Sequence, residues 1–264
     1  MPPRAGKLSV FSIGVNWIVE VGFGLRYSFL QWCQVRQMRI LPADAARIPQ
    51  AAFAPHQTPE TPMTDPIAPL REFTVAMTAL VGSTGEEHRL LATGRELLAR
   101  LIARDDWLPE AFATPRADRY AQYLLHNDPL ERFSVVSFVW GPGQRTPVHD
   151  HTVWGLVGVL RGAEACDEYR LDHGKPTPTG RRHVMQQGDI EAVSPTVGDW
   201  HRVSHAWDAR ATVSIHVYGA NIGAVLRHRQ DDTGALLDFV SGYDNALVPN
   251  LWDRSAVMRA SAAP

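Results

Sequence analysis

The chain has 264 residues, of which 45% are hydrophobic and 20% are charged, and its formal net charge at pH 7 is -2. Such a composition is ordinary for a globular protein, so it argues against a disordered or fibrous chain and against a basic nucleic-acid-binding surface. The two cysteines, Cys33 and Cys166, make neither a disulfide framework nor a cysteine zinc site, which agrees with a reducing compartment. We therefore expect a cytoplasmic protein that acts on a small molecule and binds neither nucleic acid nor a membrane.

Residues 1–62 differ from the rest of the chain in composition and in hydrophobic pattern. Polar residues break the apolar run from Leu8 to Leu30, and no small-residue cleavage site follows closely, so neither a signal peptide nor a membrane helix is predicted. The stretch then becomes rich in proline, as linkers are. We expect an N-terminal extension that either lacks regular structure or reflects an over-long gene prediction in which Met63 is the natural start.

Residues 63–118 carry two helical patterns. From Pro69 onward, apolar residues recur at spacings of three and four until Gly82-Ser83 closes the segment. Thr84 is a plausible N-cap for a second helix, whose apolar stripe runs from Leu90 to Ile102. We expect two amphipathic helices that pack on the outside of a sheet and support it.

In residues 119–264, short segments of β-forming residues are separated by turn signals, and the chain ends in a C-terminal tail. Many short strands at this spacing indicate a sandwich or barrel, and a double-sheet jelly roll fits their number. The predicted strands are residues 120–125, 133–140, 155–160, 163–171, 182–185, 190–193, 200–205 and 212–218.

The most informative stretch of the chain contains His149-Asp150-His151. In an extended strand, residues i and i+2 project from the same face, so both imidazoles can reach one point while Asp150 points away. Two imidazoles on one face suggest a metal site. His201 is the best-placed third ligand, because it begins a predicted strand that could pair near the first.

These residues resemble the cupin family. Gly143, His149, His151 and Gly162 match its first motif, and Gly188, Pro195, Gly198 and His201 approximate its second. The resemblance implies a mainly β cupin (jelly-roll) barrel, here preceded by two amphipathic helices, with a metal held by His149, His151 and His201. The first motif normally has a glutamate shortly after the second histidine, and this chain has Gly155 there.

Ser214-Ile215-His216-Val217-Tyr218 narrows the resemblance further. Ser214, His216 and Tyr218 alternate along one strand face, so all three can point into one cavity. The run is similar to that of thiol dioxygenases within the cupins, which include cysteine dioxygenase and 3-mercaptopropionate dioxygenase. The resemblance implies Fe(2+) as cofactor and a hydrogen-bond relay that ends with the tyrosine hydroxyl beside the iron.

The substrate is indicated by differences from cysteine dioxygenase. Gln122 stands where the resemblance implies a carboxylate-binding arginine, and residues 152–156 contain no cysteine to cross-link with Tyr218. The chain therefore resembles the bacterial glutamine-type enzymes that prefer 3-mercaptopropionate. Arg227 is a candidate counter-charge for the carboxylate, although a surface position fits it equally, and Trp154 is a candidate for lining the pocket.

We therefore expect an Fe(II)-dependent thiol dioxygenase whose partners are a small thiol carboxylate and O2. Cysteine dioxygenation is one alternative. A non-oxidative metal-binding cupin, either an isomerase or a ligand-binding barrel, is another, because the barrel hosts many activities. The sequence does not indicate an oligomeric state.

Overall fold

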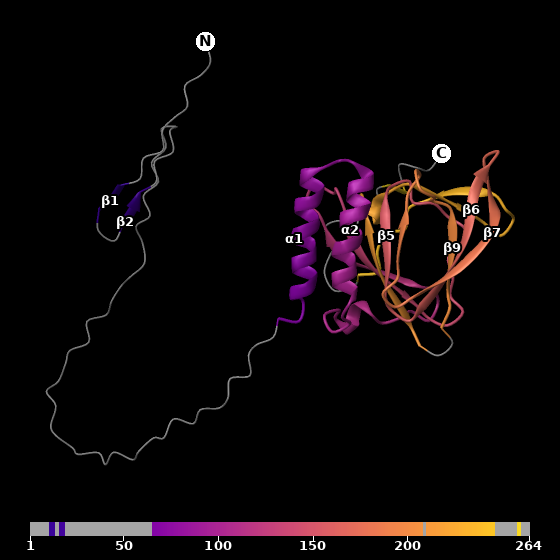
Figure 1. The fold of residues 1–264 in the computed structure, drawn as a ribbon, viewed down its shortest axis with the longest axis horizontal. Helices are drawn as coiled ribbons and strands as arrows, with labels where there is room; N and C mark the ends of the chain where they lie inside the picture. The colour runs from indigo at the N-terminus through magenta and orange to yellow at the C-terminus, as the bar shows by residue number, and fades with distance from the viewer. Residues whose placement is uncertain (1–10, 14–15, 19–64, 208–209, 246–257, 260–264) are drawn as a thin grey trace, which may run out of the picture. The chain divides into compact units, whose positions relative to one another are not determined.

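The computed structural model describes residues 11–13, 16–18, 65–207, 210–245 and 258–259 (Figure 1). The chain divides into two units, Met1–Pro59 and Glu60–Pro264. In the first unit, β1 (Phe11–Ile13) and β2 (Asn16–Ile18) pair in antiparallel fashion. The other residues of the predicted N-terminal extension, Cys33 and Met63 among them, lie outside the described residues.

Both predicted helices are present, as α1 (Ala68–Ser83) and α2 (Glu87–Ile102). The prediction of Thr84 as the N-cap of the second helix is wrong, because Glu86 holds that position. Thr84 ends α1 instead, since its backbone N–H donates to the Leu80 carbonyl over 3.3 Å. The Thr84 hydroxyl then accepts the N–H of Glu86 over 3.0 Å, in a turn that precedes α2.

The barrel is formed by two sets of antiparallel strands. The first sheet has the order β3-β4-β10-β5-β8, and the second contains β7-β6-β9. Isolated bridges join His149 to both His201 and Arg229, and so connect β9 to a further pair, β11-β12. The strand bounds are β3 Ala121–Asn127, β4 Ser134–Trp140, β5 Gly155–Arg161, β6 Ala163–Asp172, β7 Lys175–Gln186, β8 Ile190–Val193, β9 His201–His205, β10 Thr212–Tyr218, β11 Arg227–Gln230 and β12 Leu236–Phe239. Short 3-10 turns are present at Glu110–Phe112 and Ile222–Ala224.

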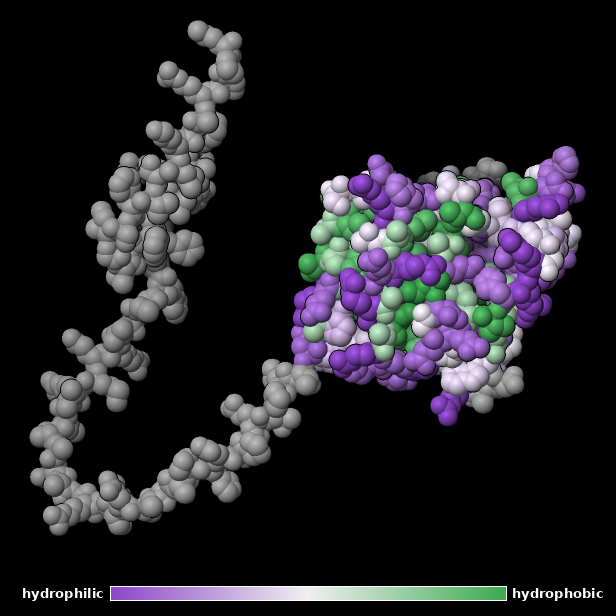
Figure 2. All heavy atoms as spheres, viewed as in Figure 1, coloured by the Kyte–Doolittle hydropathy of each residue, from purple (hydrophilic) through white to green (hydrophobic). Residues whose placement is uncertain are grey.

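The helices cover one face of the first sheet, whereas β6 and β7 lie on the opposite wall of the barrel (Figure 1). Leu98 and Ile102 of α2 pack against Leu156 and Ile215 in the main core cluster. The apolar stripe of α2 is thus directed toward the sheet. Figure 2 shows hydrophilic and apolar residues interspersed over the face of the molecule that is turned toward the viewer. The predicted support of a sheet by two helices is confirmed.

The central strand β10 is buried along its whole length, and its two faces have different chemistry. Val213, Ile215 and Val217 belong to the core cluster beneath the helices. The alternate residues Ser214, His216 and Tyr218 therefore face the barrel interior, because successive side chains of a strand point to opposite sides. The fold is a mainly β cupin-type barrel preceded by two helices, as the sequence predicts.

Eight predicted strands correspond to β3 through β10, but β7 is longer than expected and the β11-β12 pair was not predicted. Pro176 and Pro178 lie within β7, which is at the edge of its sheet, where proline is tolerated because an outward N–H needs no partner. Within the described residues, no helix is both long and apolar enough to cross a membrane.

Candidate metal centre

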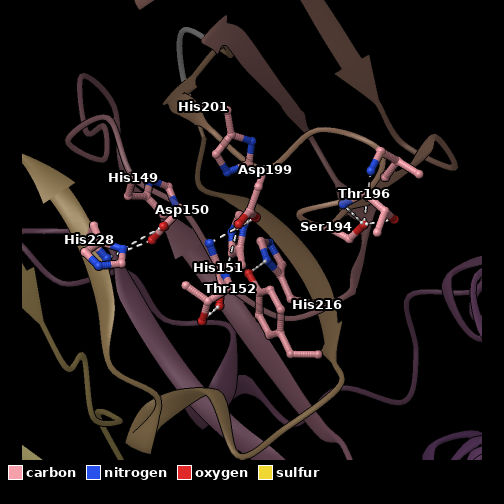
Figure 3. A network of polar contacts seen from close by, with 12 residues as sticks. His149, Asp150, His151, Thr152, Ser194, Thr196, Asp199, His201, His216 and His228 are labelled. Atoms are coloured by element: carbon pink, nitrogen blue, oxygen red, sulfur yellow. Dashed lines mark hydrogen bonds and ion pairs between the residues drawn. The ribbon is translucent and has the colours of Figure 1, made fainter. Parts of the chain in front are cut away.

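His149, His151 and His201 come together inside the barrel. Each is buried, and their candidate ligand atoms all lie within 4.8 Å of one another. Backbone hydrogen bonds fix two of them in register, because His149 N–H donates to the His201 carbonyl over 3.0 Å and His201 N–H donates back over 3.1 Å. Figure 3 shows the three rings gathered around one point, while Asp150 is turned instead toward His228, to whose backbone it is hydrogen-bonded.

Hydrogen bonds at Nδ1 leave the Nε2 atoms of two histidines available as ligands. His149 Nδ1 is 3.1 Å from the Pro147 carbonyl, and His151 Nδ1 is 2.9 Å from Asp199 Oδ1. Because a carbonyl and an ionised carboxylate only accept, Nδ1 must carry the proton in both rings. His201 Nδ1 lies 3.5 Å from Cys166 Sγ. All three rings can therefore present Nε2 to a common metal ion.

Burial keeps these imidazoles neutral. It lowers the pKa values of His149 and His151 well below the ordinary range, and each is lowered further by the charge that His201 would carry. Burial also lowers the pKa of His201, to about 4. Neutral imidazole is the form that binds a metal, so the donor set fits a divalent ion that accepts nitrogen ligands.

Gly155, at the position where a cupin glutamate is expected, leaves room for Tyr218. A Cβ atom on Gly155 would lie 2.8 Å from Cδ1 of Tyr218 and 3.0 Å from Cγ2 of Val193. The tyrosine ring occupies this space and stacks on His151, with centroids 5.3 Å apart and planes inclined by 24°. A carboxylate side chain at residue 155 would therefore displace the ring.

Ser214, His216 and Tyr218, hereafter the relay, form a continuous hydrogen-bonded chain. Ser214 Oγ is 2.8 Å from His216 Nε2, and His216 Nδ1 is 2.8 Å from the Tyr218 hydroxyl. Burial lowers the pKa of His216 well below its ordinary value and raises that of Tyr218. The ring of Phe138 stacks on His216, with centroids 4.1 Å apart. The three residues of the relay are therefore buried and uncharged.

Asp199 is a site residue that the sequence did not reveal. Its carboxylate accepts the backbone N–H and Nδ1–H of His151 over 3.0 and 2.9 Å, and the N–H of Thr152 over 2.9 Å (Figure 3). Thr152 has a φ of 61°, a left-handed conformation that threonine rarely adopts. Burial nonetheless raises the pKa of Asp199. The site thus has no carboxylate at position 155 but has one at Asp199, which would not bind the metal directly and instead orients the ligand His151.

A cavity of about 270 Å³ lies beside the triad, and His149, Tyr218, Gln122 and Arg227 are among its lining residues. Arg227 is only 4% exposed, so the surface position considered for it is excluded. Its Nη2 donates to Ser241 Oγ over 2.6 Å, whereas Nε is buried without a hydrogen-bond partner. Burial lowers the pKa of this guanidinium. Gln122 is held by its Nε2, which donates to the Gly242 carbonyl over 2.9 Å.

Trp154, a candidate for lining the pocket, is not among the residues that line this cavity. It packs against the core cluster beneath the helices. The reason is strand parity, because position 154 shares its side with Leu156, which belongs to that cluster, whereas Gly155 faces inward. Strand alternation does not predict the direction of Asp199, because this residue lies just before β9 and outside any strand.

Comparison with protein-family models gave no match. Among solved structures, the fold is similar to an uncharacterised protein with a double-stranded β-helix domain from Klebsiella pneumoniae, at 14% identity over 50% of this chain and 87% of that one, with a TM-score of 0.35. It is also similar to a putative mannose-6-phosphate isomerase from Ralstonia eutropha, at 20% identity over 42% and 93% of the two chains, with a TM-score of 0.33.

A third similar structure is the polyketide cyclase RemF from Streptomyces resistomycificus, at 21% identity over 39% of this chain and 67% of that one, with a TM-score of 0.31. At these identities and TM-scores, none of the three indicates the activity, substrate or cofactor of this chain. The chain's own residues define a cupin-type barrel with a buried histidine triad that is compatible with a metal ion.

Proposed function

We propose that this chain is an iron-dependent thiol dioxygenase that converts 3-mercaptopropionate to 3-sulfinopropionate. In the overall reaction, one thiol and one O2 give one sulfinic acid: both oxygen atoms are bonded to sulfur, which is oxidised by four electrons while O2 is reduced by four. The observation that carries the proposal is the hydrogen-bonded relay beside an all-histidine triad. The residues that carry the sequence resemblance to thiol dioxygenases are hydrogen-bonded to one another, and Tyr218 at the end of the relay lines the cavity where a substrate would bind.

His149, His151 and His201 would hold the iron through Nε2. A ferrous ion there would supply binding of the thiolate and activation of dioxygen. Three neutral imidazoles leave the double charge of the ion uncompensated by any directly bound protein carboxylate, which favours an anionic ligand such as a thiolate. The charge of Asp199 acts through the ring of His151 and strengthens that imidazole as a donor.

The cavity favours a substrate with a carboxylate and no ammonium group. Arg227 presents a buried guanidinium whose Nε has no partner, and Gln122 lies in the same cavity. A carboxylate placed there would satisfy the unpaired N–H and compensate a buried charge. Among the described residues that line the cavity, none is acidic, so the amine of cysteine or cysteamine finds no counter-ion. This supports 3-mercaptopropionate over cysteine.

The relay would orient the reacting groups. Tyr218 lines the cavity, its ring stacks on His151, and its hydroxyl is held 2.8 Å from His216 Nδ1, from where it would contact a ligand in the cavity. A donor held in this way contributes most where negative charge develops during the reaction, because it needs no reorganisation. The stacked aromatic rings of Tyr120, Phe138 and Trp140 form an apolar wall beside the relay and limit the access of water.

The proposal is tested by oxygen uptake of the iron-loaded protein with 3-mercaptopropionate, cysteine and cysteamine. We expect thiol-dependent uptake, with the highest kcat/KM for 3-mercaptopropionate. Cysteine as the preferred substrate would move the assignment to cysteine dioxygenase. No thiol-dependent uptake with any of the three, by protein shown to contain iron, would contradict the proposal and favour a non-oxidative metal-binding cupin.

A further inference from the structure

Cys166, His183 and Glu191 form a second group of possible metal ligands, apart from the histidine triad. One ligand atom from each of the three residues lies within 4.8 Å of those of the other two. In a tetrahedral zinc site, where the bonds are about 2.0–2.3 Å long, neighbouring ligand atoms are about 3.3–3.8 Å apart. Side-chain movements of about 1 Å would therefore close this group around a zinc ion.

Strands of both sheets supply the three residues. Cys166 on β6 and His183 on β7 are directly opposite each other in the second sheet, so their side chains lie on the same face. Glu191 lies on β8 in the first sheet, and its Oε2 is 3.1 Å from His183 Nε2. A metal ion held by the three side chains would therefore connect the two sheets of the barrel.

Cys166 is not a ligand of the ion that the triad would hold. Its Sγ is 3.5 Å from Nδ1 of His201, whereas the same ring presents Nε2 to the other two histidines. The two nitrogens lie on different sides of the imidazole, so the sulfur is behind the ring and out of reach of an ion bound to Nε2. The second group is therefore a separate site.

The surroundings of this site are short of positive charge. Among the described residues, the ion-pair partner recorded for Glu191 is His183 alone. Glu164 lies two positions before Cys166 and on the same face of β6, and it is a buried carboxyl group whose Oε1 has no hydrogen-bond partner. A divalent cation would balance the charges of a Cys166 thiolate and the Glu191 carboxylate.

A cavity of about 520 Å³ gives the site its own access to solvent, because His183 and Glu191 are among its lining residues. This cavity shares no lining residue with the 270 Å³ cavity beside the triad. Cys166 is buried, whereas the side chains of His183 and Glu191 are partly exposed. An ion could therefore enter past the imidazole and the carboxylate, and a water molecule could occupy a fourth position.

We propose that Cys166, His183 and Glu191 bind a zinc ion, with water as the fourth ligand, at a site distinct from the triad. Thiolate, imidazole and carboxylate are all zinc ligands, and the thiolate favours zinc over magnesium or calcium. Binding replaces the S–H bond of Cys166 with an S–Zn bond and releases the proton to solvent. Such a mixed site needs only one cysteine, and it goes beyond the dioxygenase function proposed above without depending on it.

A zinc ion at this site would support both the barrel and the triad. It would link β6 and β7 to β8, and an ion that binds only the folded chain stabilises it. Its bound sulfur would also accept the Nδ1–H of His201. The Pro147 carbonyl and the Asp199 carboxylate lie at the same position of the other two triad histidines.

Titration of the metal-free full chain with cobalt(II) tests the site. A cobalt–thiolate bond gives an intense charge-transfer absorption in the near ultraviolet, which cobalt bound by imidazoles alone lacks. We expect this thiolate band in the unaltered protein, with two cobalt ions bound per chain. Cys166→Ser should lose the band and bind one cobalt ion, at the triad.

Cys33→Ser is the matched control, because it removes the other cysteine of the chain and should keep the thiolate band. His149→Ala removes a ligand of the triad, so it should keep the band while binding one cobalt ion fewer. The proposal would be overturned by an unaltered protein without the band, by a band that persists in Cys166→Ser, or by one that is lost in Cys33→Ser.

If Cys166→Ser fails to fold, His183→Gln and Glu191→Gln keep the cysteine and remove the other two ligands. Each should weaken the cobalt binding that produces the band at least about 10-fold, because even residues that only support a ligand have effects of this size. Asp167→Asn alters a β6 carboxylate that is paired with Arg182, and it should leave this affinity unchanged. Unchanged affinity in both ligand variants would overturn the proposal.

Competition between metals tests the choice of zinc. Zinc added to the cobalt-loaded protein should abolish the thiolate band at lower concentration than iron(II) does. Loss of the band at a lower concentration of iron(II) would contradict the zinc assignment. None of these measurements depends on turnover, so a protein that shows the band but consumes no oxygen with any thiol would contradict the dioxygenase function alone.

Discussion

Gly155 and Tyr218 share one space, because a Cβ atom on the glycine would lie 2.8 Å from the tyrosine ring. Gly155→Ala should therefore push the Tyr218 ring away from His151 and break the hydrogen bond between the Tyr218 hydroxyl and His216. We expect a loss of about 1–3 kcal/mol in the free energy of unfolding, typical of overpacking, and a clear fall in kcat. Urea unfolding and oxygen-uptake assays measure both effects.

The matched control is Gly158→Ala on the same strand. Its Cβ would approach the side-chain ends of Ile102 and Leu98 at 3.0 Å, on the helix side of the sheet. Some stability should be lost there, while kcat per folded molecule stays unchanged. Equal kcat values for the two variants would show that the space at residue 155 has no bearing on the site.

Asp199→Asn tests whether the carboxylate that is hydrogen-bonded to His151 supports metal binding. The substitution removes the negative charge that holds His151 through two hydrogen bonds, so metal affinity should fall about 10–100-fold. Competition with a coloured chelator measures the dissociation constant. In Asp150→Asn, which alters a carboxylate paired with His228 instead, affinity should change little. Unchanged affinity in Asp199→Asn would show that His151 needs no such support.

Arg227→Lys tests recognition of the substrate carboxylate. Lysine keeps the charge but loses the planar fork, so KM for 3-mercaptopropionate should rise roughly 10–100-fold. Cysteamine has no carboxylate and serves as the internal control, because its KM should not change. A parallel rise in KM for both thiols would mean that the substitution distorts the cavity instead of removing one contact.

The pH dependence of stability tests the charge state of Glu164, a carboxyl group on β6 that is only 1% exposed. Its pKa is about 7 in the folded protein and 4.5 ordinarily, so between these values the folded protein holds a proton that the unfolded chain has lost. The associated stability is complete below pH 4.5 and is lost as pH rises through 7, by at most about 3 kcal/mol.

Glu164→Gln removes this contribution, so its free energy of unfolding should fall less between about pH 5 and 8 than that of the unaltered protein. Urea unfolding across this range measures the difference. Parallel curves for the two proteins would show that Glu164 is already ionised throughout.

Much of the fold was predictable because its strands are regular. The bounds of β8 and β10 agree with the predicted ranges, since apolar and β-forming residues alternate there with clear turn signals on either side. The β11-β12 pair escaped notice because β11 reads Arg-His-Arg-Gln and β12 is mostly exposed, so neither shows an apolar face. The bridge between Arg229 of β11 and His149 arises only in the folded chain.

The site was predictable where spacing encodes it and unpredictable where only folding does. His149 with His151, and Ser214 with His216 and Tyr218, lie two residues apart, so strand alternation alone brings each set to one face. Asp199 is one of 28 acidic residues, and it reaches His151 through a tertiary contact that no local sequence pattern predicts.

A thiol dioxygenase transfers both atoms of O2 to the sulfur of its thiol substrate. The most direct test is to supply the iron-loaded protein with 3-mercaptopropionate and oxygen-18 gas, and to measure the mass of the product. We expect a sulfinate that carries two labelled oxygen atoms. A product with one labelled atom, a disulfide, or unchanged thiol would contradict the proposed function.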